Sequence, residues 1–211
     1  MDIVNPAAQA YAEKYSSGED DLLKEISEHT LANHSKAHML SGHLQGKFLE
    51  MISYMIRPSR ILEIGTFTGY SALCLEKGLA ADGTLHTIEI REDDAATAGL
   101  FFQKKDVKRI LLHVGEALNI IGQLEETWDL VFIDADKVSY SLYFKSVLPK
   151  VRAGGFILVD NVLFHGQVLE AEIRGKNAKA IHEFNDMIAA RTDVEKVLLP
   201  LRDGLYLIRK L

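Results

Sequence analysis

Acidic and amide side chains stand where two predicted strands end, in the second half of the chain. Asp134 closes the apolar run Trp128–Ile133, and Asp160 and Asn161 close the run Phe156–Asp160. If these strands are neighbours in a sheet, the three side chains meet at its carboxyl edge. Two carboxylates and one amide oxygen form a hard, oxygen-only ligand set, which favours Mg²⁺, or Mn²⁺ or Ca²⁺, over zinc. The pattern therefore predicts a divalent-metal site.

Lys137, three residues after Asp134, is a candidate general base. Beside a dication the ammonium form is disfavoured, so we expect the pKa of Lys137 to fall toward a range that suits a base. The metal would also acidify a bound hydroxyl, and both effects help to make an oxygen nucleophile. Each residue has a simpler alternative, since Asp134 could cap the next helix and Asp160-Asn161 could form a turn.

The loop after the predicted strand Arg60–Ile64 contains two glycines that suit a nucleoside site. Gly65 and Gly69 allow a sharp turn and a close approach to a ligand, and Ser71 follows near the start of the next helix. The loop lacks the G-x-G-x-x-G of dinucleotide sites and the Gly-Lys-Ser/Thr of the P-loop. The remaining pattern, E-x-G-x-x-x-G-x-S, suits a ligand without phosphates. Glu63 suits its ammonium or sulfonium region; a plain strand–helix turn is the alternative.

Glu89 ends the second predicted strand, Thr84–Ile90. An acidic residue at this position can accept hydrogen bonds from both hydroxyls of a ribose. The alternative is a charged strand end at the surface. Position and residue type together favour the ribose role.

Three other candidates for chemistry are weaker. His34 and His38 have the i, i+4 spacing of a metal pair, but no H-E-x-x-H glutamate or third ligand accompanies them. Ser71 lies in a segment without the last glycine of a nucleophile elbow. Cys74, the one cysteine, lies in an apolar helical segment and is most simply a small core residue.

Strands and helices alternate from residue 59 onward and must position these side chains. Pro200–Gly204 is too short for a parallel crossover and permits an antiparallel hairpin. We therefore predict a doubly wound, mostly parallel α/β sheet closed by an antiparallel hairpin. Ala153–Gly155 is predicted as a turn. The predicted strands are Arg60–Ile64, Thr84–Ile90, Arg109–Val114, Trp128–Ile133, Phe156–Asp160, Val194–Leu199 and Leu205–Arg209.

Residues 1–57 contain helical spacing and no strand-like run. Apolar residues recur at helical intervals in Asp20–His34 and in Leu44–Ile56, and Ala7–Lys14 suits a short helix. No linker separates this region from the rest. We predict one domain over residues 1–211, in which 1–57 is a helical attachment to an α/β core at 58–211.

Composition restricts the class of protein. The chain has 211 residues, 47% hydrophobic and 26% charged, which suits one soluble globular domain. A net charge of −6 argues against a nucleic-acid binder. One cysteine permits no intrachain disulfide, and the sequence shows neither a signal peptide nor a membrane-spanning run. We expect a cytoplasmic protein without nucleic-acid or membrane partners.

The segments LEIGTFTGYSAL, FIDADK followed by Tyr140, and LVDNVL together resemble the cation-dependent class I O-methyltransferases. This family includes caffeoyl-CoA and catechol O-methyltransferases and small bacterial relatives. The C-terminal VEKVLLPLRDGLYLIRKL is also similar to the bacterial members. The resemblance runs from about residue 37 to the C-terminus, and Phe164 stands where bacterial relatives often carry Trp.

The resemblance implies a seven-stranded sheet and S-adenosylmethionine as methyl donor. It also implies a homodimer, because dimers are common in this family. It implies Lys137 as the base and Asp134, Asp160 and Asn161 as metal ligands. The acceptor would be a small vicinal diphenol, catechol-like or hydroxycinnamoyl, that chelates the metal. The residues implied around the cofactor are Met39, Glu63, Gly65, Ser71, Glu89, Ala117 and Asp134.

Two other functions are weighed against this one. A nicotinamide-dependent oxidoreductase would share the sheet, but it expects the G-x-G-x-x-G loop that is missing. A non-catalytic cofactor-binding module could keep the fold and lose the chemistry. Lys137 together with all three candidate ligands argues against such a module, because a retired site need not retain them.

Overall fold

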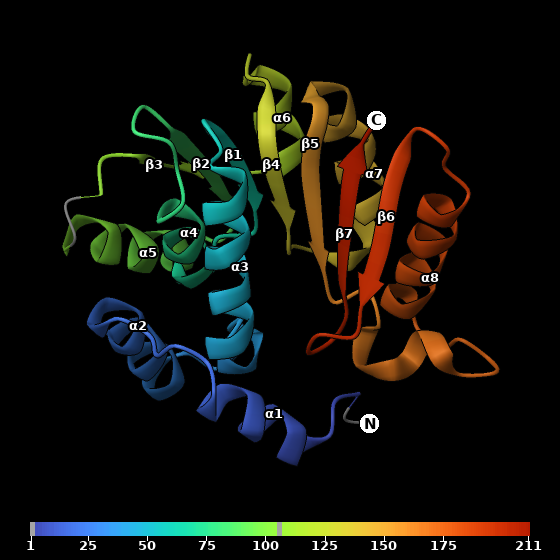
Figure 1. The fold of residues 1–211 in the computed structure, drawn as a ribbon, viewed down its shortest axis with the longest axis horizontal. Coiled ribbons are helices and arrows are strands. Elements are labelled where there is room, and N and C mark those ends of the chain that lie inside the picture. The colour runs from blue at the N-terminus through green and yellow to red at the C-terminus, as the bar shows by residue number, and fades with distance from the viewer. Residues whose placement is uncertain (1–2, 105–106) are drawn as a thin grey trace.

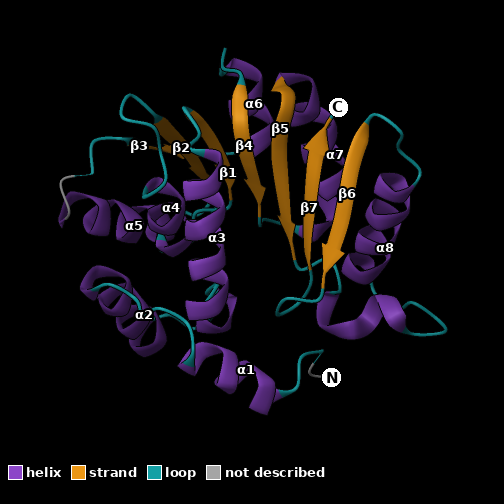
Figure 2. Ribbon diagram, viewed as in Figure 1, coloured by secondary structure: helices purple, strands orange, loops and turns teal. Residues whose placement is uncertain are grey.

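A seven-stranded sheet forms the centre of the computed structural model, which describes residues 3–104 and 107–211 (Figures 1 and 2). The strand order is β3-β2-β1-β4-β5-β7-β6. All pairs from β3 to β5 are parallel, whereas β7 is antiparallel to both β5 and β6. The predicted sheet with its closing hairpin is confirmed. The strands are β1 Arg60–Ile64, β2 Thr84–Glu89, β3 Ile110–Val114, β4 Trp128–Ile133, β5 Val151–Asp160, β6 Val194–Leu199 and β7 Leu205–Lys210.

Helices cover both faces of the sheet (Figure 1). Side chains of α2, α3, α4 and α5 share one buried cluster with one face, and those of α6, α7 and α8 share a second cluster with the other. In residues 3–104 and 107–211, no helix is both long and apolar enough to cross a membrane. The α-helices are α1 Pro6–Lys14, α2 Asp21–Asn33, α3 His43–Ile56, α4 Tyr70–Glu76, α5 Glu92–Lys104, α6 Ala117–Gln123, α7 Tyr140–Val147 and α8 Lys176–Ala189. Short 3₁₀ helices are η1 Ala37–Met39, η2 Lys137–Ser139, η3 Leu148–Lys150 and η4 Phe164–Leu169.

The central strands are buried on both faces, which explains their continuous apolar runs. Leu130 and Phe132 of β4 pack into the cluster on the α2–α5 face. Val131 and Ile133 pack into the opposite cluster. Covered parallel strands lack the apolar–polar alternation of half-exposed ones.

The strand order reverses between β1 and β4. From β1 the chain moves outward to β2 and β3, and from β4 it moves the other way to β5. Ligands of such sheets bind outside the carboxyl ends of the strands at this point. The loops after β1, β2, β4 and β5, which hold the candidate site residues, all begin at this edge.

The N-terminal helices pack against the α/β core. The Asp20 side chain caps α2 by accepting a hydrogen bond from the Leu23 amide at 2.9 Å. Leu23 of α2 and Leu49 of α3 are buried in the same cluster as Ile61 of β1. These helices are thus tied to the sheet by apolar burial.

The prediction of a turn at Ala153–Gly155 is wrong. Strand β5 already begins at Val151, and its register with β4 shifts between Trp128 and Leu130. Gly154 has a φ of 74°, so the two glycines form an irregularity within the strand. Glycine supplies the positive φ of a β-bulge as readily as that of a turn, and the local pattern does not distinguish them.

Candidate active site

Gly65 allows the loop after β1 to lie directly against the end of β4. Its φ is 103°, and a Cβ at this position would lie 2.0 Å from the Asp134 carbonyl oxygen. The Gly65 amide donates to the Ile88 carbonyl at 2.9 Å, and the Asp134 amide donates to Ile64 at 2.9 Å. The ends of β1, β2 and β4 are therefore held together around this glycine.

Replacing Gly65 by alanine is expected to lower the free energy of unfolding by about 3 kcal/mol or more, because the backbone strain and the clash act together. Gly122→Ala is the control: Gly122 lies in α6, and apart from its chain neighbours and its own helix backbone no described atom lies within 4 Å of an added Cβ. That change should stabilise the fold by roughly 0.5–1 kcal/mol through helix propensity. Urea denaturation measures both variants, and equal stabilities would contradict the close approach.

Glu63 is fully buried near the carboxyl end of β1, just before the glycine loop. Thr87 donates a hydrogen bond to its Oε2 at 2.5 Å, while Oε1 accepts no hydrogen bond within the parts of the chain that the structure describes. Burial raises the pKa of Glu63 to about 8, an effect that hydrogen bonding reduces and the carboxylates of Asp134 and Glu89 increase. A buried carboxyl group with an unpartnered oxygen suits a nearby positive charge.

Backbone amides fix the Glu89 carboxylate at the end of β2. Oε2 accepts from the Phe67 amide at 2.7 Å, and Oε1 accepts from the amides of Ile90 and Arg91 at 3.1 and 3.0 Å. These three bonds leave some lone-pair capacity of the carboxylate for a ligand. The geometry is compatible with the predicted ribose contact.

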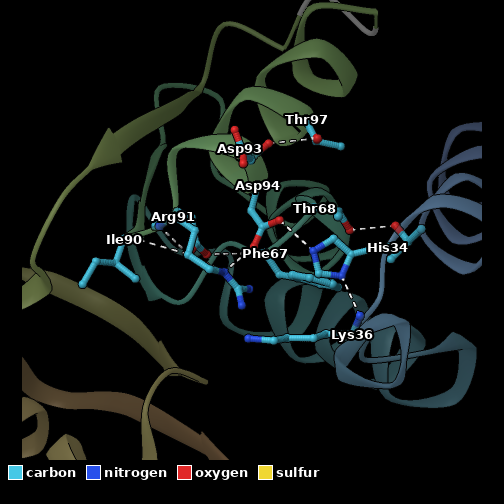
Figure 3. Close-up of polar contacts among 11 residues, drawn as sticks. His34, Lys36, Phe67, Thr68, Ile90, Arg91, Asp93, Asp94 and Thr97 are labelled. Atoms are coloured by element: carbon cyan, nitrogen blue, oxygen red, sulfur yellow. Dashed lines mark hydrogen bonds and ion pairs between the residues drawn. The ribbon is translucent and has the colours of Figure 1, made fainter.

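A polar cluster joins the segment after α2 to this region (Figure 3). His34 Nε2 lies 3.0 Å from Asp94 Oδ1, and Asp94 also forms an ion pair with Arg91. The Arg91 guanidinium lies 5.6 Å from the centre of the Phe67 ring, and the His34 ring meets that ring edge-on at 4.7 Å. His34 therefore contacts the glycine loop rather than pairing with His38.

Asp160 and Asn161 lie at the end of β5, held by two distant parts of the chain. Asp160 is 1% exposed; its Oδ2 accepts from Gln45 Nε2 at 2.7 Å and its Oδ1 accepts from the Asn161 amide at 2.8 Å. Asn161 has a φ of 57°, and its Nδ2 donates to Asp203 Oδ2 at 3.2 Å. The sequence interpretation missed Gln45 and Asp203, because no local pattern connects α3 or the β6–β7 turn to β5.

Lys137 lies among oxygen atoms at the start of η2. Its Nζ donates to Asp134 Oδ1 at 2.9 Å and to Tyr140 Oη at 2.7 Å. Burial acts to lower the pKa of Lys137, but Asp134, Tyr140 and Asp160 together raise it above its ordinary value. This direction is opposite to the one expected beside a dication, because in the protein alone the neighbouring carboxylates favour the ammonium form. The helical cap is Asp136, which accepts from the Ser139 amide, and not Asp134.

One cavity of about 850 Å³ brings most of the predicted site residues together. Its volume lies in the upper range of ligand pockets, so it has room for two small ligands. Glu63 and Asp160 do not line it; they are buried behind its wall. The predicted residues that line it are Met39, Gly65, Ser71, Glu89, Ala117, Asp134, Lys137 and Asn161.

The oxygen donors fit a hard dication. Burial, together with repulsion from the Asp134 carboxylate, raises the pKa of Asp160 to about 6. Because the Asn161 side-chain nitrogen is bonded to Asp203, the amide oxygen Oδ1 is the side-chain atom of Asn161 that could bind a metal. No group of three or more His, Cys, Asp or Glu side chains in the described parts of the chain is arranged to hold a metal. The set has only two carboxylates, so the Asn161 amide would complete it.

A family model described as O-methyltransferase matches residues 13–211. The chain belongs to the O-methyltransferase family. This membership confirms the resemblance and identifies the chain as a methyl-transferring enzyme rather than a nicotinamide-dependent oxidoreductase.

Individual members of the family match between about three quarters of the chain and nearly all of it. A probable caffeoyl-CoA O-methyltransferase of Dictyostelium discoideum is 33% identical over 208 residues, covering 95% of this chain and 90% of that protein. A catechol O-methyltransferase of Niastella koreensis is 33% identical over 162 residues, covering 74% and 73%. The crystal structure of an SAH-bound methyltransferase from Podospora anserina superimposes with a TM-score of 0.90 at 32% identity, covering 97% and 94%.

Proposed function

We propose that this O-methyltransferase moves the methyl group of S-adenosylmethionine to one hydroxyl of a small vicinal diphenol, with a divalent cation at the β4–β5 edge. One observation carries the proposal: Asp134, Lys137 and Asn161 share a cavity with the Gly65 loop and Glu89. Donor, base and metal ligands would then surround one reaction centre. The relatives named for catechol and caffeoyl-CoA support a catechol-like or hydroxycinnamoyl acceptor.

The donor is supported by the geometry around β1 and β2. The Podospora anserina structure contains SAH, and its fold matches this one over nearly the whole chain. Glu63 would face the positive end of the donor, Glu89 its ribose, and Met39, Ser71 and Ala117 its remaining surface. Gly65 would let the donor approach the backbone closely.

The residues at the β4–β5 edge would carry the chemistry. When bound, S-adenosylmethionine supplies an electrophilic methyl on a positive sulfur, and the dication lowers the pKa of a hydroxyl that it binds. Asp134, Asp160 and Asn161 would hold the cation. Beside a dication bound there, the neutral amine of Lys137 would be favoured over its ammonium form, and the amine would then take the proton of the reacting hydroxyl at Nζ, with Tyr140 Oη orienting it. The freed oxygen would attack the methyl carbon, and the C–S electron pair would stay with sulfur.

The test is methyl transfer from S-adenosylmethionine to a panel of vicinal diphenols, with Mg²⁺ and then with EDTA. We expect turnover that EDTA abolishes. Turnover that survives EDTA would overturn the metal role and keep the methyl transfer. Tight donor binding without turnover on any acceptor would favour the non-catalytic module.

Binding of S-adenosylmethionine is expected to release close to one proton at pH 7. Free Glu63, with a pKa of about 8, is mostly protonated at that pH, and a bound cation favours its ionised form. The donor affinity should therefore rise with pH up to about 8. Calorimetry in two buffers of different ionisation enthalpy measures the proton count.

Glu63→Gln is the control for this proton. The variant keeps the shape of the side chain and removes its titration, so the released proton should disappear. Equal proton release by Glu63→Gln and the unaltered protein would show that another group titrates, and would contradict the role of Glu63 at the donor.

A homodimer and a cytoplasmic location belong to the same proposal. The common dimers of the resembled family support the first, and the free, buried Cys74 suits a reducing compartment. Light scattering with size-exclusion chromatography tests the oligomer, and cell fractionation tests the location.

A further inference from the structure

Arg202 lies in the turn between β6 and β7 and lines the same cavity, as do Phe164 and His165. Its φ is 49°, a left-handed conformation that a non-glycine residue rarely adopts. Such backbone outliers concentrate at functional sites, where the surrounding structure maintains them. The function of Arg202 therefore needs a specific explanation.

Ion pairs distinguish Arg202 from the other cations of the cavity. Lys137 pairs with Asp134 at 2.9 Å, and Arg91 pairs with Asp94. The Arg202 guanidinium donates from Nη1 to the Ser41 carbonyl oxygen at 2.6 Å. Within residues 3–104 and 107–211, no carboxylate forms an ion pair with it.

The adjacent carboxylate, that of Asp203, is not the ion-pair partner of Arg202, because its oxygens bind other groups. Its Oδ1 accepts from the His165 amide and its Oδ2 from Asn161 Nδ2, and the His165 ring lies 3.7 Å away. Arg202 directly precedes Asp203, and the turn that contains both residues positions Asn161, a proposed metal ligand. It lies near enough to Asp160 to favour the charged form of that carboxylate.

A partly buried guanidinium that forms no ion pair within the described residues suits an anionic ligand. The group carries five N–H donors in a planar fork that fits a carboxylate with two parallel hydrogen bonds. The bond to Ser41 uses one nitrogen, and the other donors make no hydrogen bond within residues 3–104 and 107–211. Removing a charge from water is unfavourable unless a partner compensates it.

We propose that Arg202 binds a carboxylate of the methyl acceptor, so that this enzyme prefers aromatic vicinal diphenols that carry a free carboxylate. The inference rests on the proposed function. The hydroxyls would lie at the Asp134–Lys137 end, and the carboxylate at the Arg202 end. Arg202 determines specificity here and does not take part in bond making.

The experiment compares a carboxylate-bearing diphenol with its methyl ester, which keeps the ring and both hydroxyls and removes the charge. The unaltered protein should show the higher kcat/KM for the acid. In Arg202→Gln the acid-to-ester ratio of kcat/KM should fall roughly 10–100-fold, the range for a lost charge-assisted hydrogen bond. Arg202→Lys should recover part of the ratio, because it restores the charge without the fork.

Two further variants and a binding measurement separate this role from a structural one. Arg202→Gly removes the bond to Ser41 and accommodates the positive φ, and it should lose the ratio as Arg202→Gln does. Asp186→Asn, on an exposed carboxylate of α8, should leave the ratio unaltered. Calorimetry should show weaker binding of the acid to Arg202→Gln while donor binding persists.

Three results would overturn the proposal. An equal loss of kcat/KM for acid and ester would mean that Arg202 has only a structural role, through its hydrogen bond from the turn to Ser41. An unaltered ratio would exclude the carboxylate contact. The third result is a preference for the coenzyme A thioester of the same acid over the acid itself. If that preference required Arg202, the group bound by Arg202 would be a phosphate and not a carboxylate. If neither acid nor ester is methylated, the proposed function fails, and the calorimetric comparison of acid binding still decides on Arg202.

Discussion

Replacing Lys137 by methionine is expected to lower kcat for a vicinal diphenol by about 10²–10⁴-fold, the usual contribution of a general base. Methionine has a similar length but cannot accept the hydroxyl proton. The donor should still bind, because all the residues implied around it except Asp134 lie on other segments of the chain. Steady-state rates at saturating Mg²⁺ and acceptor measure kcat, and single-turnover rates separate chemistry from product release.

Lys145→Met is the matched control, because Lys145 lies exposed on α7, eight residues after Lys137. It should keep nearly all activity. If Lys137→Met retained more than about a tenth of kcat, the base would be another group. Tyr140, whose Oη lies 2.7 Å from Nζ, would then be the next residue to replace.

Replacing Asp160 by asparagine is expected to weaken Mg²⁺ binding by at least about 100-fold, because even residues that only support metal ligands contribute 10–100-fold. The fold should not suffer. Burial raises the pKa of Asp160, so its ionised form is a cost to the folded state at neutral pH, and the neutral amide removes that cost. In this variant the Mg²⁺ affinity measured by calorimetry should therefore fall, while the free energy of unfolding measured by urea denaturation should rise.

Asp186→Asn serves again as the control, since it removes an exposed carboxylate. It should alter neither Mg²⁺ affinity nor stability by a measurable amount. Asp160→Ala tests the same site more severely. Full activity of Asp160→Ala at saturating Mg²⁺ would rule out the proposed metal set.

Local patterns in the sequence were sufficient to predict much of the fold and to place several of the proposed site residues at one edge of the sheet. The glycine loop, Glu89, Asp134 and Asp160-Asn161 stand at strand ends, where the pattern of the strand itself indicates the position. The carboxyl edge of a parallel sheet then brings them together. Their placement followed from topology, without knowledge of side-chain packing.

The supporting residues could not be predicted in this way. Gln45 contacts Asp160 across 115 positions, and Asp203 contacts Asn161 across 42. In the sequence Arg202 resembles an ordinary polar turn residue, and only the folded structure places it at the wall of the cavity. Such contacts depend on how α3 and the final hairpin pack, which residue spacing does not encode. The bulge in β5 escaped prediction for the related reason that glycine pairs serve several backbone geometries.

The hydrogen bond from Gln45 to Asp160 limits how this enzyme can be recombined with its relatives. Exchanging N-terminal regions is an obvious route to altered acceptor choice, because residues before α3 line the cavity. A crossover placed at residue 57 would transplant α3 as well and replace the support of a proposed metal ligand. A crossover between η1 and α3, near Gly42, would exchange the cavity lining and retain Gln45. We expect chimeras with the crossover near Gly42 to keep metal binding. Chimeras with the crossover at residue 57 should lose it wherever the relative that supplies α3 lacks a side chain equivalent to Gln45.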